Sequence, residues 1–218
     1  SRGLGDVYKR QILIRMISHR FLFLLLLLLP IHNSVAQEET FEPLFENIDI
    51  TKGLPHNTVQ KIFQDSEGYM WFATKDGLCR YDCYNFIVYC ESLVKESISN
   101  SKVRCIAEDA YKNIWVGTWG AGLHLLHDAY NPEKTTWTTF THDENRSGTI
   151  SDNLIYAISE DLNTNSLWVG TRSSLSILPM RNVETSRFYF ENCYSGESEN
   201  SITSSEVASL LRDRQGIM

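Results

Sequence analysis

Apolar and β-branched residues recur along the chain in short runs that are separated by tight-turn sequences. In the first such stretch, the runs span residues 58–64, 70–74, 78–81 and 85–89. Asp-Ser-Glu-Gly at 65–68 and Asp-Gly at 76–77 separate the first three runs. Asp in the first position and Gly in the fourth suit a type I turn, and Asp-Gly is typical of a hairpin. The pattern therefore predicts four short β-strands joined by turns within residues 54–90.

This pattern repeats in register, with copies near residues 54–90, 98–140, 150–190 and 202–218. Every copy has an Asp at the end of its first strand, and the first three copies have a Trp in the second strand. The recurring positions are Asp65, Gly68 and Trp71, then Asp109, Trp115 and Gly117, then Asp161, Trp168 and Gly170, and finally Asp213. We expect the Trp side chains to be buried between sheets. The Gly that follows Trp by two positions should let the sheets pack closely.

The length of the repeat indicates the architecture. The Trp residues of consecutive copies are 44 and 53 residues apart. Four strands in such a period are typical of one blade of a β-propeller. A β-sandwich with accidental self-similarity is the alternative, but four copies in register favour the propeller. We predict an all-β fold with about three four-stranded blades and the start of a fourth, an incomplete ring that indicates a fragment.

The first 36 residues differ in character from the rest of the chain. Residues 16–36 begin with Met, continue through a basic pair and a nine-residue apolar run, and end in Ser-Val-Ala. This is the pattern of a secretory signal peptide cleaved between Ala36 and Gln37, with a membrane anchor or a buried helix as the alternative. Residues 1–15 resemble translated adapter DNA and are interpreted as a non-native extension, or else as a genuine one. Residues 37–218 are then the partial propeller domain.

Composition narrows the class of protein further. The chain is 42% hydrophobic, which is ordinary for a globular fold. Its formal net charge is −7, which argues against a nucleic-acid-binding segment, since such segments carry a basic face. No apolar run reaches the length of about 18 residues that spans a bilayer, so no transmembrane helix is expected inside the chain.

Motifs for catalysis, metal binding or cofactor binding are missing from the sequence. His124 and His127 should fall on opposite faces of an expected strand, so they do not form a metal pair. The loop that begins at Asp161 lacks the glycine and the final acid of a calcium-binding EF-hand. We therefore expect no catalytic residue, no metal and no cofactor, and a role in binding. For the five cysteines, one bridge within the first blade and free thiols throughout are both left open.

Candidate ligand-binding residues follow from the repeat. Lys75, Trp119 and Arg172 each come directly after the Thr that ends the second strand of a copy. Equivalent positions of neighbouring blades lie at the same end of a propeller, so these side chains should cluster there. An aromatic platform beside two cations suits a sugar, including an acidic one. Solvated loop residues without a binding role are the alternative.

The copies resemble the two-component regulator propeller repeat. The first copy shows Gly-Leu at 53–54, the Asp, turn Gly and Trp described above, and a second Gly-Leu at 77–78. The second copy shows Gly-Thr at 117–118. Ala73 and Asn113 depart from the family pattern, because each stands where Gly is usual.

The resemblance implies the periplasmic ligand-sensing head of a Bacteroides-type hybrid two-component histidine kinase, on the periplasmic side of the inner membrane. Such proteins detect oligosaccharides and carry a transmembrane helix and a kinase after their propellers. The expected ligand is therefore an oligosaccharide or another small molecule. Contact with the membrane is expected only through a downstream helix, and a homodimer is left open. A secreted carbohydrate-active enzyme on a propeller scaffold and a protein-interaction module are the alternatives.

Overall fold

The computed structural model describes residues 44–91, 98–131, 134–181, 188–196, 201–211 and 213. The expected signal peptide (16–36) and the expected extension before it (1–15) lie outside the described residues. Within the described part of the chain, no helix is long and apolar enough to cross a membrane.

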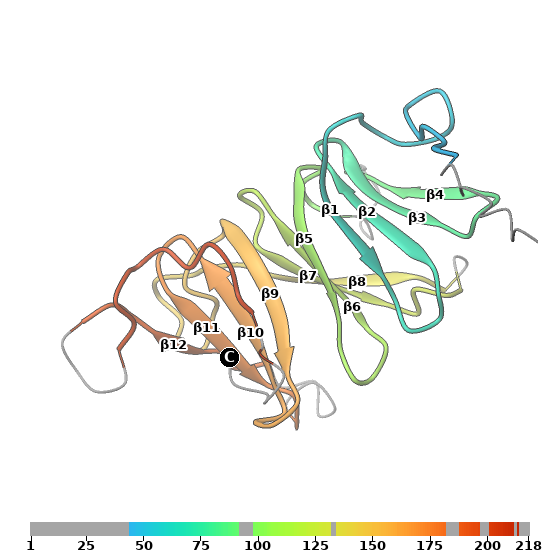
Figure 1. Cartoon of the computed structure of the whole chain (residues 1–218). Coiled ribbons are helices and arrows are strands. Elements are labelled where there is room, and N and C mark those ends of the chain that lie inside the picture. The colour runs from blue at the N-terminus through green and yellow to red at the C-terminus, as the bar shows by residue number, and fades with distance from the viewer. Residues whose placement is uncertain are drawn as a thin grey trace, which may run out of the picture. The chain divides into compact units, whose positions relative to one another are not determined.

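Three four-stranded sheets make up the fold (Figure 1). In each sheet the strands lie in sequence order, and each strand pairs antiparallel with the next. Blade 1 comprises β1 (Val59–Gln64), β2 (Met70–Thr74), β3 (Gly77–Tyr81) and β4 (Phe86–Tyr89). Blade 2 comprises β5 (Val103–Glu108), β6 (Ile114–Thr118), β7 (Leu123–His127) and β8 (Thr136–Phe140). Blade 3 comprises β9 (Ile155–Asp161), β10 (Ser166–Thr171), β11 (Leu175–Pro179) and β12 (Glu191–Cys193).

The blades adjoin one another through their first strands. β5 contacts both β1 and β9, as can be followed in Figure 1. Consecutive four-stranded meanders that meet at their first strands are successive blades of a β-propeller. The predicted fold of about three blades is confirmed, and the strands predicted for the first copy agree with β1 to β4 to within one residue.

Hydrophobic clusters between the blades hold them together. Trp71 packs with Ile98 in a cluster shared by blades 1 and 2, and Trp115 packs with Ile150 in a cluster shared by blades 2 and 3. Both indoles are fully buried, as predicted. Trp168 is only half-buried, contrary to the expectation. The reason is that no fourth sheet is present among the described residues to cover the corresponding face of blade 3.

The Asp at the end of the first strand connects the following turn to the Trp. The indole N–H of Trp71 donates to Asp65 Oδ2 at 2.7 Å, and that of Trp115 donates to Asp109 Oδ2 at 2.7 Å. The backbone N–H of Gly68 donates to the Asp65 carbonyl at 3.1 Å, which confirms the predicted turn. Gly68 has φ +93°, a conformation that favours glycine.

The third copy uses a different contact. Its turn has one more residue, so Trp168 follows Asp161 by seven positions where the other copies have six. The indole N–H of Trp168 donates to Ser166 Oγ at 2.9 Å, and Asp161 Oδ2 accepts from the Thr164 hydroxyl at 2.5 Å. Asp213, the corresponding acid of the fourth copy, is exposed.

Two glycines let neighbouring blades approach closely, as predicted. A Cβ on Gly117 would lie 2.6 Å from Ile155 Cγ2, and a Cβ on Gly170 would lie 2.5 Å from the Val207 carbonyl oxygen. Both distances are too short for a side chain. Val207 therefore packs on blade 3 as Ile155 packs on blade 2, which shows that the fourth copy begins in register.

All five cysteines lie in the described part of the chain, and all are free thiols. The alternative of free thiols therefore holds, and Cys83 and Cys90 are exposed and unbridged. Burial raises the pKa of Cys79 and that of Cys105 to about 12, so both remain protonated and unreactive at neutral pH. No group of three or more His, Cys, Asp or Glu side chains is placed to hold a metal among the described residues.

Candidate functional site

A pocket of about 410 Å³ lies between blades 1 and 2. It is formed by the start of each blade's first strand and by the turn that follows each blade's second strand. The lining residues are Gln60, Lys75, Lys102, Val103, Arg104 and Trp119. We call this site the cationic pocket, because half of its lining residues are Lys or Arg and none is acidic.

Strand pairing brings these residues to one end of the blades. Val59 at the start of β1 pairs with Thr74 at the end of β2. Val103 and Thr118 pair in the same way in blade 2. The turn after each Thr therefore lies beside the start of the first strand in both blades.

Buried threonines fix the turns that carry the predicted residues. The hydroxyl of Thr74 donates to the Gly77 carbonyl at 2.8 Å, and that of Thr118 donates to the Gly122 carbonyl at 2.8 Å. Thr171 makes the equivalent bond in blade 3 at 2.8 Å. Because each bond closes its own turn, the position after the Thr is held in place without a ligand.

Arg104 is the most constrained cation of the pocket. Its guanidinium carbon lies 4.7 Å from the ring centroid of Trp119 and 4.2 Å from that of Tyr156. The two ring centroids are 5.8 Å apart. Cation–π contact with two rings positions the guanidinium group and limits its freedom. Trp119 nevertheless keeps 45% of its surface exposed, so it can contact a ligand as well as Arg104.

The structure divides the three predicted ligand-binding residues. Lys75 and Trp119 line the cationic pocket together, whereas Arg172 is not among its lining residues. Arg172 Nε donates to Asp152 Oδ2 at 3.1 Å and forms an ion pair with that carboxylate. Burial alone would raise the pKa of Asp152, but hydrogen bonds from Ser173 and from the Leu154 backbone, together with the Arg172 charge, lower it. Asp152 therefore stays ionised and compensates Arg172.

Sequence reasoning missed Lys102, Arg104 and Tyr156. The signal was present in the repeat, because Gln60, Arg104 and Tyr156 are each the second residue of a blade's first strand. Equivalent positions of adjacent first strands lie near one another. The equivalence of these positions in the repeat therefore predicts that Arg104 lies beside Tyr156.

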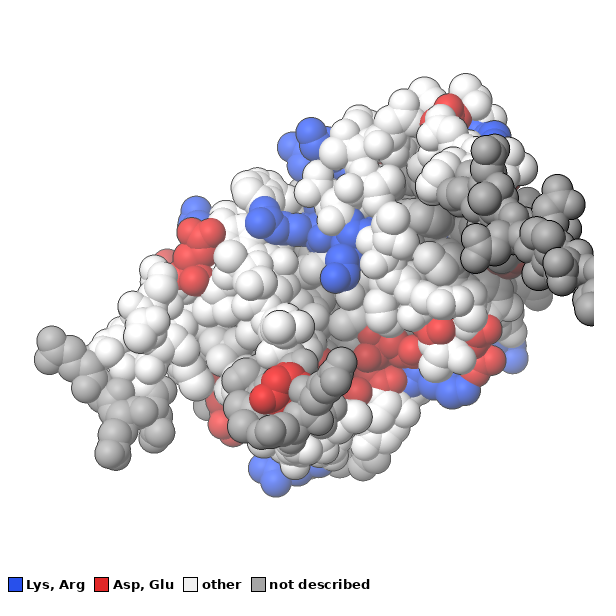
Figure 2. Space-filling model, viewed as in Figure 1, with Lys and Arg blue, Asp and Glu red and all other residues white. Residues whose placement is uncertain are grey.

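Acidic residues gather at the other end of the first strands. Figure 2 shows a group of Lys and Arg side chains near the middle of the molecular face and, apart from it, a group of Asp and Glu side chains that has Lys or Arg beside it. At the end of β5, Glu108 accepts hydrogen bonds from the backbone N–H and the hydroxyl of Ser66, each at 2.7 Å. At the end of β9, Glu160 Oε1 accepts from the Ala110 N–H at 2.9 Å. Each Glu thus connects its own blade to a turn of the preceding blade.

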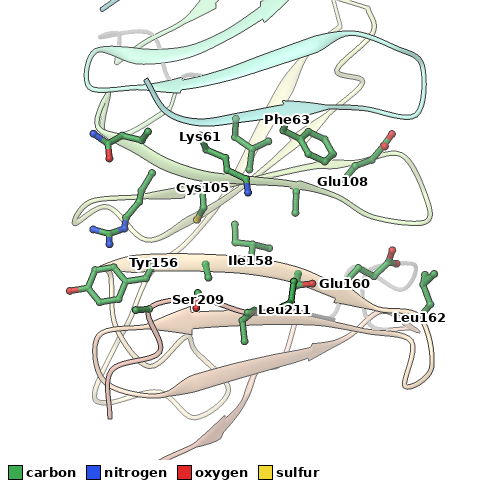
Figure 3. A pocket seen from close by; sticks show the side chains of 18 residues that line it. Lys61, Phe63, Cys105, Glu108, Tyr156, Ile158, Glu160, Leu162, Ser209 and Leu211 are labelled. Atoms are coloured by element: carbon green, nitrogen blue, oxygen red, sulfur yellow. The ribbon is translucent and has the colours of Figure 1, made fainter. Parts of the chain in front are cut away.

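A second cavity, of about 710 Å³, runs along the first strands of the three blades and the segment 208–211. In Figure 3, Tyr156 lies at one end of this cavity and Glu108 and Glu160 lie at the other. Arg104 lines both this cavity and the cationic pocket. The cavity carries both signs of charge, whereas the cationic pocket carries one sign only.

Two segments of the chain, residues 53–76 and 97–120, match the family model described as two component regulator propeller. The resemblance of the repeats to this family is thereby confirmed. All six lining residues of the cationic pocket fall within these two segments. No curated protein matches the chain.

Solved structures share the fold. The extracellular domain of the hybrid two component system BT3049 from B. thetaiotaomicron has a TM-score of 0.62 and 24% identity, over 74% of this chain and 21% of that chain. The corresponding domain of BT4673 from the same organism has a TM-score of 0.56 and 22% identity, over 78% and 21%. PorZ, a surface component of the type-IX secretion system of Porphyromonas gingivalis, has a TM-score of 0.53 and 16% identity, over 72% and 23%. The matched region spans about a fifth of each of these longer structures.

Proposed function

We propose that this chain is part of the extracellular sensor head of a hybrid two-component system, and that it binds an oligosaccharide at the cationic pocket. The observation that carries the proposal is that this pocket lies between the two segments that match the two component regulator propeller model. The exposed Trp119 ring offers a face for a sugar, and Lys75 can donate hydrogen bonds to its hydroxyl groups. The fold shared with extracellular domains of B. thetaiotaomicron sensors supports the same role.

The proposal includes export and a kinase. The signal pattern of residues 16–36 would direct the propeller to the periplasmic side of the inner membrane. Ligand binding would then shift the population between two signalling geometries of the whole sensor. Sequencing the gene beyond the codon for residue 218 tests this part. A transmembrane helix and a histidine kinase are expected there, and a stop codon soon after the propeller would contradict the kinase.

Ligand binding is tested on the full-length gene product with an array of oligosaccharides, followed by titration calorimetry on every saccharide that binds. The Trp119→Ala variant should weaken binding by about tenfold or more, because a stacking platform at the centre of a site contributes strongly to affinity. Tyr84→Ala is the matched control, since Tyr84 is an aromatic residue that is 88% exposed in the turn between β3 and β4. The proposal fails if no saccharide binds in a Trp119-dependent way. Hydrolysis of a bound glycan would instead favour the enzyme alternative.

A further inference from the structure

The charges that line the cationic pocket indicate which class of saccharide it can bind. We propose that its ligand is an anionic saccharide, with a carboxylate or sulfate group held by Arg104, Lys75 and Lys102 while the sugar ring lies on Trp119. This inference rests on the proposed function, because it assumes that the pocket is the ligand site of the sensor head.

The charges of the pocket are not compensated. None of the ion pairs formed between described residues involves Lys75, Lys102 or Arg104. No acidic side chain lines the pocket. This concentration of positive charge stands out in a chain whose formal net charge is −7. A neutral ligand would leave these cations without a partner, whereas an anionic group would provide one.

The pocket is also organised before a ligand arrives. The guanidinium group of Arg104 contacts the rings of both Trp119 and Tyr156, at 4.7 and 4.2 Å from their centroids. The backbone N–H of Trp119 donates to the Lys102 carbonyl at 3.0 Å, which connects the turn of Trp119 to the strand start that carries the cations. A guanidinium group that is already oriented loses less entropy when it pairs with a carboxylate or sulfate.

The shape of the site suits a small ligand. Its volume of about 410 Å³ lies in the range of small-molecule sites, which starts at about 300 Å³. Both blades that form it have all four strands. Arg172 serves as an internal contrast, because it occupies the turn position equivalent to Lys75 and Trp119 but is already neutralised by Asp152.

Three tetrasaccharide probes test the proposal on the full-length gene product by titration calorimetry. They are tetragalacturonate, its carboxyl-reduced neutral counterpart, and a sulfated galactose tetrasaccharide. At least one anionic probe should bind about tenfold or more tightly than the neutral one, because charge-assisted hydrogen bonds are roughly twice as strong as neutral ones. The comparison of the two anionic probes shows whether carboxylate or sulfate is preferred. Binding should also weaken as salt is raised.

Two variants connect the preference to the pocket. Arg104→Gln and Lys75→Gln should each reduce the affinity for the anionic probe by about tenfold and leave the affinity for a neutral probe nearly unchanged. Lys75 is exposed, so its variant keeps the test valid even if Arg104→Gln disturbs packing. Arg146→Gln, at an exposed Arg outside the pocket, is the matched control and should bind as the parent protein does.

The outcomes separate the two proposals. If neutral saccharides bind in a Trp119-dependent way with no advantage for the anionic probes, the anionic preference is wrong and the sensor proposal stands. If the anionic probes bind to both pocket variants as tightly as to the parent protein, the preference does not arise in this pocket and the inference is overturned. Failure of all three probes to bind at millimolar concentration overturns it as well. Absence of any Trp119-dependent binding to the oligosaccharide array overturns both proposals.

Discussion

The Asp109→Ala substitution removes the acceptor on which the buried indole of Trp115 depends. Asp109 is itself buried, and its Oδ2 accepts the Trp115 indole N–H at 2.7 Å. Its Oδ1 accepts the backbone N–H groups of Tyr111 and Asn113, each at 2.9 Å. The side-chain amide of Asn113 also donates to this carboxylate, to Oδ2 at 3.0 Å. The substitution therefore leaves four donor groups without their acceptor, in and beside the turn that joins β5 and β6.

The magnitude follows from the burial of each donor. Trp115 is fully buried, so its N–H cannot form a hydrogen bond with water instead. A buried donor without a partner costs about 1–3 kcal/mol. The two backbone donors and the Asn113 amide are partly buried, and water can replace the carboxylate there at a cost of about 1 kcal/mol in total. We expect the free energy of unfolding to fall by about 3 kcal/mol. That is a large share of the roughly 5–15 kcal/mol that stabilises a typical domain.

Urea unfolding of the full-length gene product, followed by circular dichroism, measures this loss. Asp76→Ala is the matched control, because Asp76 is exposed in the turn between β2 and β3, and it should change the stability by no more than about 0.5 kcal/mol. In a Trp115→Phe background the indole N–H is absent, so Asp109→Ala should cost about 1–2 kcal/mol less there. Equal losses for Asp109→Ala and Asp76→Ala would refute the reasoning, and so would additive effects of Asp109→Ala and Trp115→Phe.

Two further stability predictions concern the contact between blades and the pH dependence. Gly117→Ala should lower the free energy of unfolding by about 1–3 kcal/mol, because the added Cβ would overlap Cys105 of the same blade and Ile155 of the next. Gly196→Ala, whose Cβ would meet its nearest atom at 3.6 Å, should be nearly neutral in the same urea assay. Burial lowers the pKa of His124 from 6.5 to about 4, so the unfolded chain takes up its proton at a higher pH than the folded chain does. The contribution of His124 is therefore complete above about pH 6.5 and is lost as the pH falls to about 4, by up to about 3 kcal/mol. Urea midpoints at pH 7, 5.5 and 4 measure this, and a His124→Gln variant with the same pH dependence as the parent would contradict it.

The spacing of the blades connects the stability of the fold to the geometry of the cationic pocket. Gly117 sets how closely blade 3 approaches blade 2, and Trp119 follows it by two residues. Tyr156, at the start of blade 3, reaches Arg104 across this contact. A change that separates blades 2 and 3 would therefore release Arg104 from one of its two rings and loosen the cationic pocket.

The repeat made most of the fold predictable. Strands such as Met70–Thr74 are bounded by turns whose chemistry is local, so their limits could be located without tertiary information. Burial of Trp71 and Trp115 and the close approach at Gly117 followed from the period of the copies. Trp168 was the exception, because its burial depends on whether another sheet covers it, and its indole bonds to Ser166 after a one-residue insertion.

The sequence by itself determined the blade, its turns and the end of the blade at which the position after each Thr lies. Two of the three predicted ligand-binding residues, Lys75 and Trp119, do line one pocket. Only the tertiary structure decided that Arg104 joins them and that Arg172 does not. The physical reason is that hydrogen bonding within a strand or turn is local, whereas these cation–π contacts and this ion pair join residues that are far apart in the sequence and meet only in the folded chain. Arg104 contacts Tyr156 across a blade boundary, and Arg172 forms an ion pair with Asp152 of its own blade.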